Sequence, residues 1–293
     1  MIARPPVRTQ FLIFTLFGEY ILPEGRDAWT AGLLQLLNLL EVSERAARST
    51  LSRMAEKGWL TSERAGRHSR YALTPRGIRL VKEGQVRIFE PRRTTWDGLW
   101  HMLVYSIPEG KRRLRGKLRQ RLGWLGFGRL APGTWIAPTD RREEVRLQLE
   151  DLGLMAYAQY FSGLRLHFAD NAEIVRRCWD LETLNRDYAA FLDTYEPVFQ
   201  RVRGEDHRGR PMPPAEHFVL HFWLTLGYTQ FPRRDPNLPP ALQPAGWLGT
   251  RASQTFQEFH QLLKEPSDRF VNELVTAQPD GNRRSGLRNP ARP

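Results

Sequence analysis

Apolar side chains recur at helical spacing through the first sixty residues of the chain. Residues 8–18 are dense in Phe and Leu, which predicts a helix buried on most sides, and a second helix is indicated by an apolar face of Trp29, Leu33, Leu36, Leu37 and Leu40. A third helix is predicted to begin at Ser43, because a serine oxygen accepts hydrogen bonds from the free N–H groups of a first helical turn. Its narrow inward stripe consists of Ala47, Leu51 and Met54.

The opposite face of this third helix is short-chained and basic. It carries Arg45, Arg48, Ser49, Ser52 and Arg53. Small residues let a helix lie deep in a major groove while arginine side chains reach bases or phosphates. An ordinary solvated face more often mixes Glu and Lys four residues apart. We therefore expect these five residues, together with Ser43, to contact DNA.

Residues 59–73 predict a hairpin of two short strands around a glycine-containing turn. Basic side chains are expected at its tip: Arg64, Arg67, His68 and Arg70. Three helices followed by such a hairpin predict a winged helix-turn-helix domain over residues 1–90, in which the third helix contacts bases and the hairpin contacts backbone or minor groove. The alternative is a winged helix that binds another protein.

The middle of the chain alternates between apolar runs and amphipathic stretches. Strands are predicted at 99–107, 133–138 and 154–161, with helices over 109–122 and 140–152, an order that favours a ferredoxin-like α/β sandwich over residues 91–165. The first of these helices is ringed by seven cations: Lys111, Arg112, Arg113, Arg115, Lys117, Arg119 and Arg121. They either hold phosphates of DNA or of a ligand, or remain solvated.

Residues 166–278 predict a helical domain, and residues 279–293 a disordered tail. His217 and His221 lie four residues apart on a predicted helix over 215–231, a spacing known from zinc sites. However, no acid lies between them and no third ligand is apparent, so we expect packed or hydrogen-bonded histidines and no metal. The single cysteine, Cys178, is expected to fill space beside Trp179.

Charge and composition narrow the function. The formal net charge is +12, and it divides into +5 over residues 1–90, +7 over 91–165 and zero over 166–293, which points to a localised surface for a polyanion. One cysteine excludes an intrachain disulfide and fits a reducing cytoplasm. The sequence lacks a signal peptide and the roughly 20 apolar residues of a membrane span, so we expect a soluble cytoplasmic protein with no membrane partner.

Seven blocks of the sequence, in order between about residues 8 and 265, form a recognisable set: TLFGEY (15–20), VSERAARSTLSRMAEKGWL (42–60), GRHSRYALTPRG (66–77), WDGLW (96–100), GFGRLAPGTW (126–135), WDLETLNRDYAAFL (179–192) and DPNLPPALQPAGW (235–247). In these blocks the chain resembles the PaaX-type transcriptional repressors of phenylacetic acid catabolism. The resemblance implies a winged-helix domain, a central domain similar to the small CRISPR adaptation nuclease, and a helical C-terminal domain. It also implies a homodimer that binds double-stranded operator DNA and is released by phenylacetyl-CoA.

The sequence departs from the family pattern at one place. Trp223-Leu224-Thr225 stands where family members tend to have a Tyr-Arg-Arg-like stretch.

We therefore predict an α+β repressor of an aromatic-acid catabolic operon. An aryl acyl-CoA needs an aromatic pocket and cations for its phosphates, for which the candidates are His221, Phe222, Trp223, Tyr228, Trp247, Arg115 and Arg119. The aromatic candidates are equally suited to a core.

Two other functions stay open on the sequence alone. One is an effector-independent architectural DNA-binding protein, and the other is a nuclease built on the central domain. A metal-dependent nuclease needs clustered carboxylates, yet the first central strand ends Val104-Tyr105-Ser106 without an Asp. No familiar catalytic motif is present either, so we expect no catalytic residue and no cofactor.

Overall fold

The computed structural model describes residues 7–25, 27–85, 95–207 and 212–278, and in this part the chain is mixed α+β with two antiparallel sheets. The predicted disordered tail, residues 279–293, lies outside the described residues. The chain divides into two compact units, one of residues 1–86, 194–227 and 255–293 and one of residues 87–193 and 228–254. One break between the units, at residues 86/87, lies close to the expected limit near 90, but residue 165 lies inside the second unit and the C-terminal helices are shared between both units. The sequence-based domain limits stay predictions.

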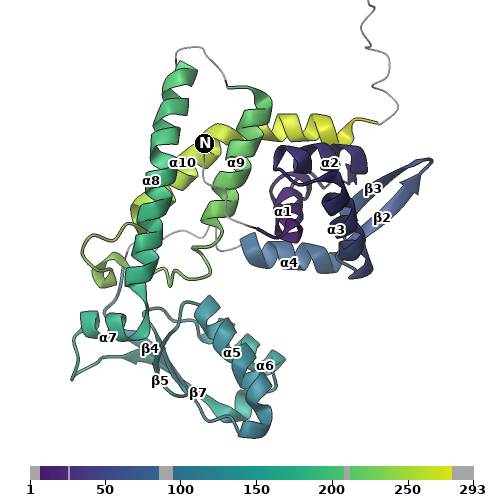
Figure 1. Ribbon diagram of the computed structural model, residues 1–293. Helices are drawn as coiled ribbons and strands as arrows, with labels where there is room; N and C mark the ends of the chain where they lie inside the picture. The colour runs from purple at the N-terminus through teal and green to yellow at the C-terminus, as the bar shows by residue number, and fades with distance from the viewer. Residues whose placement is uncertain (1–6, 26, 86–94, 208–211, 279–293) are drawn as a thin grey trace, which may run out of the picture. The chain divides into compact units, whose positions relative to one another are not determined.

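The N-terminal part of the first unit consists of packed helices and a small sheet (Figure 1). Its elements are α1 (Thr9–Leu16), the π-helical turn η1 (Phe17–Ile21), β1 (Ala28–Trp29), α2 (Thr30–Leu39), α3 (Glu44–Glu56), β2 (Leu60–Ala65), β3 (His68–Leu73) and α4 (Pro75–Gln85). The strands pair antiparallel in the order β1-β3-β2. The sequence anticipates the helices and the hairpin, but not the two-residue strand β1, which is too short to produce an alternating pattern.

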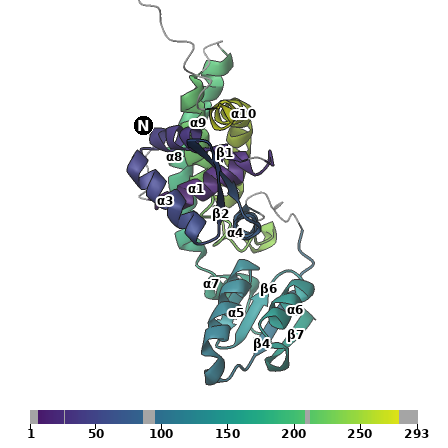
Figure 2. The ribbon, with the colours of Figure 1, turned by 90° about the vertical axis from the view of Figure 1, so that its right-hand side faces the viewer.

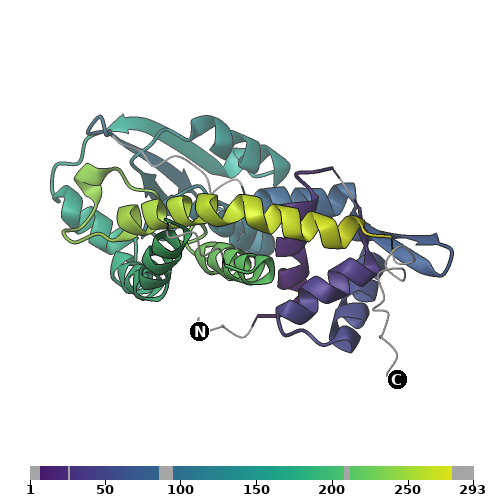
Figure 3. The same cartoon turned by 90° about the horizontal axis from the view of Figure 1, so that it is seen from above.

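Long helices complete the first unit from the other end of the chain. They are α8 (Leu181–His207, from residue 194 onward), α9 (Pro214–Tyr228) and α10 (Gly249–Thr276, from residue 255 onward). Helix α10, the long yellow helix of Figure 3, is not interrupted by the proline it contains, Pro266. The apolar core of the unit combines Leu16, Leu36 and Leu51 with Phe222 and Val271, so side chains distant in sequence exclude water together.

The second unit is built around a four-stranded antiparallel sheet of order β5-β6-β4-β7. Its elements are β4 (Trp100–Tyr105), η2 (Glu109–Lys111), α5 (Arg112–Trp124), β5 (Gly128–Ala131), β6 (Thr134–Ala137), α6 (Arg142–Asp151), η3 (Met155–Tyr157), β7 (Ala158–Leu164), α7 (Asn171–Cys178) and η4 (Pro240–Leu242). Helices α5 and α6 cover one side of the sheet (Figure 2), where Leu118 and Val145 pack on Leu103. On the other side, Val104 and Phe161 are exposed.

Within the described residues, no helix is both long enough and apolar enough to cross a membrane.

Candidate nucleic-acid interface

Helix α3 presents the basic, short-chained face that its sequence predicts. The Ser43 hydroxyl accepts a hydrogen bond from the Ala46 N–H (3.4 Å) at the start of the helix. Four side chains point inward and are buried: Ala47, Thr50, Leu51 and Met54. The six side chains predicted to contact DNA are all exposed: Ser43, Arg45, Arg48, Ser49, Ser52 and Arg53. A partner can therefore reach all six within this unit.

The cations of α3 are held only loosely by the helix itself. Arg48 Nε lies 2.8 Å from Glu44 Oε1, and the two side chains are 57% and 66% exposed. Such an exposed pair four residues apart stabilises a helix by about 0.3–0.5 kcal/mol. Arg53 donates to the Thr50 hydroxyl at 3.2 Å. A phosphate or a guanine edge can displace these weak contacts, because charge-assisted bidentate bonds are stronger.

The hairpin next to α3 ends in a tight turn, with one exposed arginine in the turn and another near the end of β2. Strands β2 and β3 pair from Leu60 with Leu73 to Ala65 with His68, which leaves Gly66 and Arg67 in the turn. Gly66 has φ +62°, a conformation that favours glycine. Arg64 and Arg67 are exposed, whereas His68 is half-buried with its ring edge-on to Trp29 (centroids 6.3 Å apart).

Arg70 is the one predicted hairpin-tip residue that the structure places elsewhere. It lies inside β3, paired with Glu63 on one side and Trp29 on the other. Its guanidinium stacks over the Trp29 ring at 4.0 Å and binds Asp27 Oδ2 at 3.2 Å. The sequence does not reveal this, because the partner strand β1 has only two residues.

The residues predicted to bind an effector are divided between the two units. His221, Phe222 and Trp223 belong to the first unit and are buried there, with Phe222 and Trp223 in its apolar core. The second unit holds Tyr228, Trp247, Arg115 and Arg119.

In the second unit, the aromatic members have packing partners and one of the two arginines is paired. Tyr228 packs against Phe191, and Trp247 contacts Tyr188 edge-on. Arg115 pairs with Glu109 at 2.7 Å, which lowers the pKa of that carboxyl through the hydrogen bond and the charge. Arg119 is exposed on α5. Phe222, Trp223 and Tyr228 are therefore buried in packed interiors, Trp247 is half-buried, and an effector site at these residues stays a prediction.

The second unit contains a cavity of about 890 Å³ between the α7–α8 junction and the η4 segment. Its lining includes Arg176, Arg177, Cys178, Trp179 and Gln243. Burial raises the pKa of the Cys178 thiol to about 11, so this cysteine is protonated at neutral pH and is a poor nucleophile. Sequence reasoning missed this cavity, because α7 and η4 are separated by more than sixty residues.

Comparison with known proteins gives one family over nearly the whole chain. Family models match in order: PaaX-like protein at residues 8–77, PaaX protein central Cas2-like domain at 93–175 and PaaX-like protein C-terminal domain at 179–273. The transcriptional repressor PaaX of Escherichia coli K12 is 30% identical over 271 residues, which cover 92% of this chain and 84% of that protein. An uncharacterized protein from Mycobacterium tuberculosis has a similar fold, with a TM-score of 0.59, 21% identity and coverage of 90% of this chain and 98% of that one. The sequence resemblance is thus confirmed, and the chain belongs to the PaaX family.

Proposed function

We propose that this protein is a transcriptional repressor that binds operator DNA through α3 and the β2–β3 hairpin. The observation that carries the proposal is the exposed surface of α3 and its cap Ser43, which presents three arginines and three serines, together with a hairpin that exposes Arg64 on β2 and Arg67 in the turn. In the proposed winged helix-turn-helix, α3 enters the major groove and the hairpin contacts the adjacent backbone or minor groove. The family relative in Escherichia coli is a transcriptional repressor, which agrees with the function expected from the sequence.

We further propose that the protein binds as a homodimer and is released by an aryl acyl-CoA such as phenylacetyl-CoA. A dimer reads two half-sites about one helical turn apart, and an effector releases it only by preferring a geometry that no longer matches that spacing. The second unit offers exposed apolar side chains for pairing, among them Val104 and Phe161. Its cavity combines the Trp179 ring with Arg176 and Arg177, two cations suited to phosphates.

The decisive experiment measures operator affinity of single-arginine variants. An operator is first selected from a random duplex pool, and binding is then followed by fluorescence anisotropy at several salt concentrations. Arg48→Ala and Arg53→Ala should each cost about 1–3 kcal/mol and relax sequence preference, whereas Arg67→Ala should weaken all duplexes alike and reduce the salt slope by about one. Arg201→Ala, at an exposed arginine of α8 outside every candidate surface, is the matched control for charge and should have no such effect. Unchanged operator binding by both α3 variants would refute the assignment of this helix.

The same assay separates the proposed repressor from the other functions. Phenylacetyl-CoA should lower operator affinity of the wild type, and Arg176→Ala should blunt that response without changing DNA binding in its absence. No response to any acyl-CoA, with equal affinity for operator and random duplex, would indicate an architectural protein. Cleavage of the duplex that EDTA abolishes would indicate a nuclease.

A further inference from the structure

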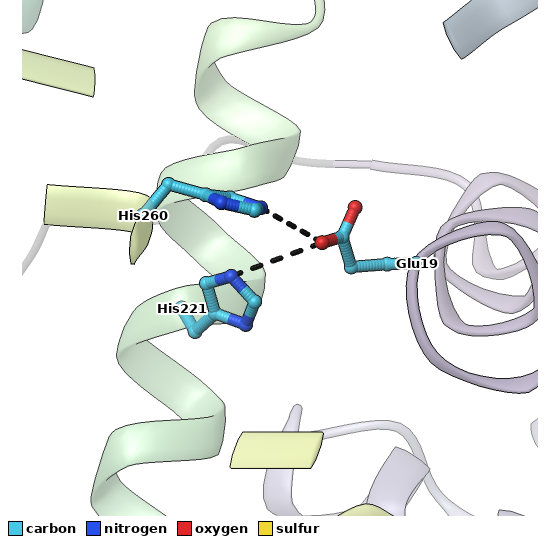
Figure 4. A group of neighbouring side chains, drawn as sticks. All are labelled: Glu19, His221 and His260. Atoms are coloured by element: carbon cyan, nitrogen blue, oxygen red, sulfur yellow. Dashed lines mark hydrogen bonds and ion pairs between the residues drawn. The ribbon is translucent and has the colours of Figure 1, made fainter. Parts of the chain in front are cut away.

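Three buried side chains from three distant parts of the chain meet inside the first unit (Figure 4). Glu19 lies on η1, His221 on α9 and His260 on α10, and each is less than 10% exposed. Burying a carboxylate and two imidazoles costs free energy unless their charges and lone pairs are satisfied. A hydrogen bond between Glu19 and His260 offsets part of this cost, but the buried Nε2 atom of His221 has no hydrogen-bond partner.

The potential ligand atoms converge on one small volume. Glu19 Oε1 lies 2.7 Å from His260 Nε2 and 3.8 Å from His221 Nε2, and one ligand atom of each residue lies within 4.8 Å of the others. In a tetrahedral zinc site with bonds of about 2.0–2.1 Å, neighbouring ligand atoms are roughly 3.3 Å apart. The two distances to Glu19 bracket that value, and the ligand atoms of the two imidazoles are at most 4.8 Å apart, so shifts of up to about 1 Å bring the three to that spacing.

His221 is the member whose environment asks for a further partner. Its Nδ1 lies 2.8 Å from the Tyr20 hydroxyl, while its Nε2 is buried without a hydrogen-bond partner. When Nδ1–H donates to the Tyr20 oxygen, Nε2 presents a lone pair toward Glu19. Metal-binding histidines are oriented in this way, with the second ring nitrogen fixed by an outer hydrogen bond.

Lys264 on α10 is a cation whose charge acts on His221, but it is itself paired: its ammonium group lies 2.8 Å from Asp268 Oδ2. This pairing reduces the repulsion between Lys264 and a metal cation.

We propose that Glu19, His221 and His260 bind one divalent transition-metal ion of the zinc type, which links the N-terminal helices to α9 and α10. Two imidazoles and a carboxylate are ligands of intermediate softness that suit Zn²⁺, Co²⁺ and Ni²⁺, whereas Mg²⁺ and Ca²⁺ prefer oxygen alone. This proposal departs from the sequence analysis, which expected packed histidines and no metal because no third ligand was apparent beside His217 and His221. In the structure His221 lies near His260 instead, and Glu19, 241 residues before His260, is the third candidate ligand.

The test uses the tag-free, full-length protein, stripped with EDTA and titrated with Zn²⁺ and with Co²⁺. We expect one equivalent to bind, the visible absorption of four-coordinate Co²⁺ to appear, and the melting temperature to rise on loading. Glu19→Gln and His260→Gln should abolish the absorption, and Tyr20→Phe should weaken binding by about 10–100-fold. His217→Gln, one turn earlier on α9, is the matched control and should bind as the wild type does.

Two outcomes would overturn the proposal. If titration of the stripped wild type with Co²⁺ gives no more signal than titration of buffer alone, the three residues form a hydrogen-bonded cluster without metal. If Glu19→Gln and His260→Gln bind as tightly as the wild type, the metal lies elsewhere. Far-UV circular dichroism checks that the variants fold; if they do not, X-ray absorption of the zinc-loaded wild type decides, since two imidazole ligands are expected and their absence refutes the site.

Discussion

The arginines predicted to bind DNA have different surroundings in this protein, and these surroundings decide whether each side chain is available to DNA or stabilises the fold. Arg48 and Arg64 are exposed, and the contact of Arg48 with Glu44 is weak enough to be exchanged for DNA. Arg70 is half-buried, stacked on Trp29 and paired with Asp27. The first two are therefore available to a ligand, while the third supports the sheet that carries the hairpin.

Replacing Arg70 should accordingly weaken the fold as well as DNA binding. Arg70→Ala removes a cation–π contact and a half-exposed ion pair, which together should lower the free energy of unfolding by about 1 kcal/mol. Arg64→Ala on the neighbouring strand should change it by less than about 0.5 kcal/mol, as expected for a surface site. Urea denaturation of both variants measures the difference. Equal stability of the two would show that the Trp29 stack contributes nothing.

The exposed arginines follow from a local pattern in the sequence, since exposure on a helix is set by spacing. The role of Arg70 does not, because it depends on the isolated pair Ala28–Trp29. The convergence of Glu19, His221 and His260 is also outside local patterns, as the three residues come from opposite ends of the chain.

Helices and strands were predictable wherever they carry their own signals. Helix α3 begins one residue after the predicted cap Ser43, and the hairpin turn falls at the predicted glycine. Helix α7 was not predicted: it has only eight residues and ends at Cys178, where Gly128 of β5 packs closely against it. Such close approaches between elements depend on tertiary structure, which a one-dimensional pattern does not contain.

The packing of α2 against α10 gives a test at such a close approach. A Cβ at Gly32 would fall on the backbone carbonyl of Leu274, so Gly32→Ala must push the two helices apart and should cost about 1–3 kcal/mol of stability. Gly116 lies inside α5 with open space around it, so Gly116→Ala should instead stabilise by about 0.5–1 kcal/mol through helix propensity. Thermal unfolding of both variants checks the opposite signs. If Gly32→Ala leaves the melting temperature unchanged, the two helices do not approach each other so closely.

Across the chain, net positive charge and apolar packing divide the molecule differently. The net positive charge is confined to the first 165 residues, which suggested a localised surface for a polyanion in that part of the chain. The core beneath α3 nevertheless includes Phe218, Phe222 and Val271 from the C-terminal helices. The rigidity of the proposed DNA-binding surface therefore depends on residues more than 160 positions away.

Truncating one such residue should loosen the N-terminal helices selectively. Phe222 is fully buried in the first unit, and Phe222→Ala should cost about 3–5 kcal/mol through the cavity it leaves. Hydrogen exchange followed by mass spectrometry should then show faster exchange in residues 30–56, because loss of core packing lowers the free energy of local opening. Phe127→Ala, an equally buried change in the second unit, is the matched control and should leave those amides protected. If residues 30–56 exchange alike in both variants, the N-terminal helices do not draw their stability from α9, and the boundary near residue 90 marks an independent folding unit after all.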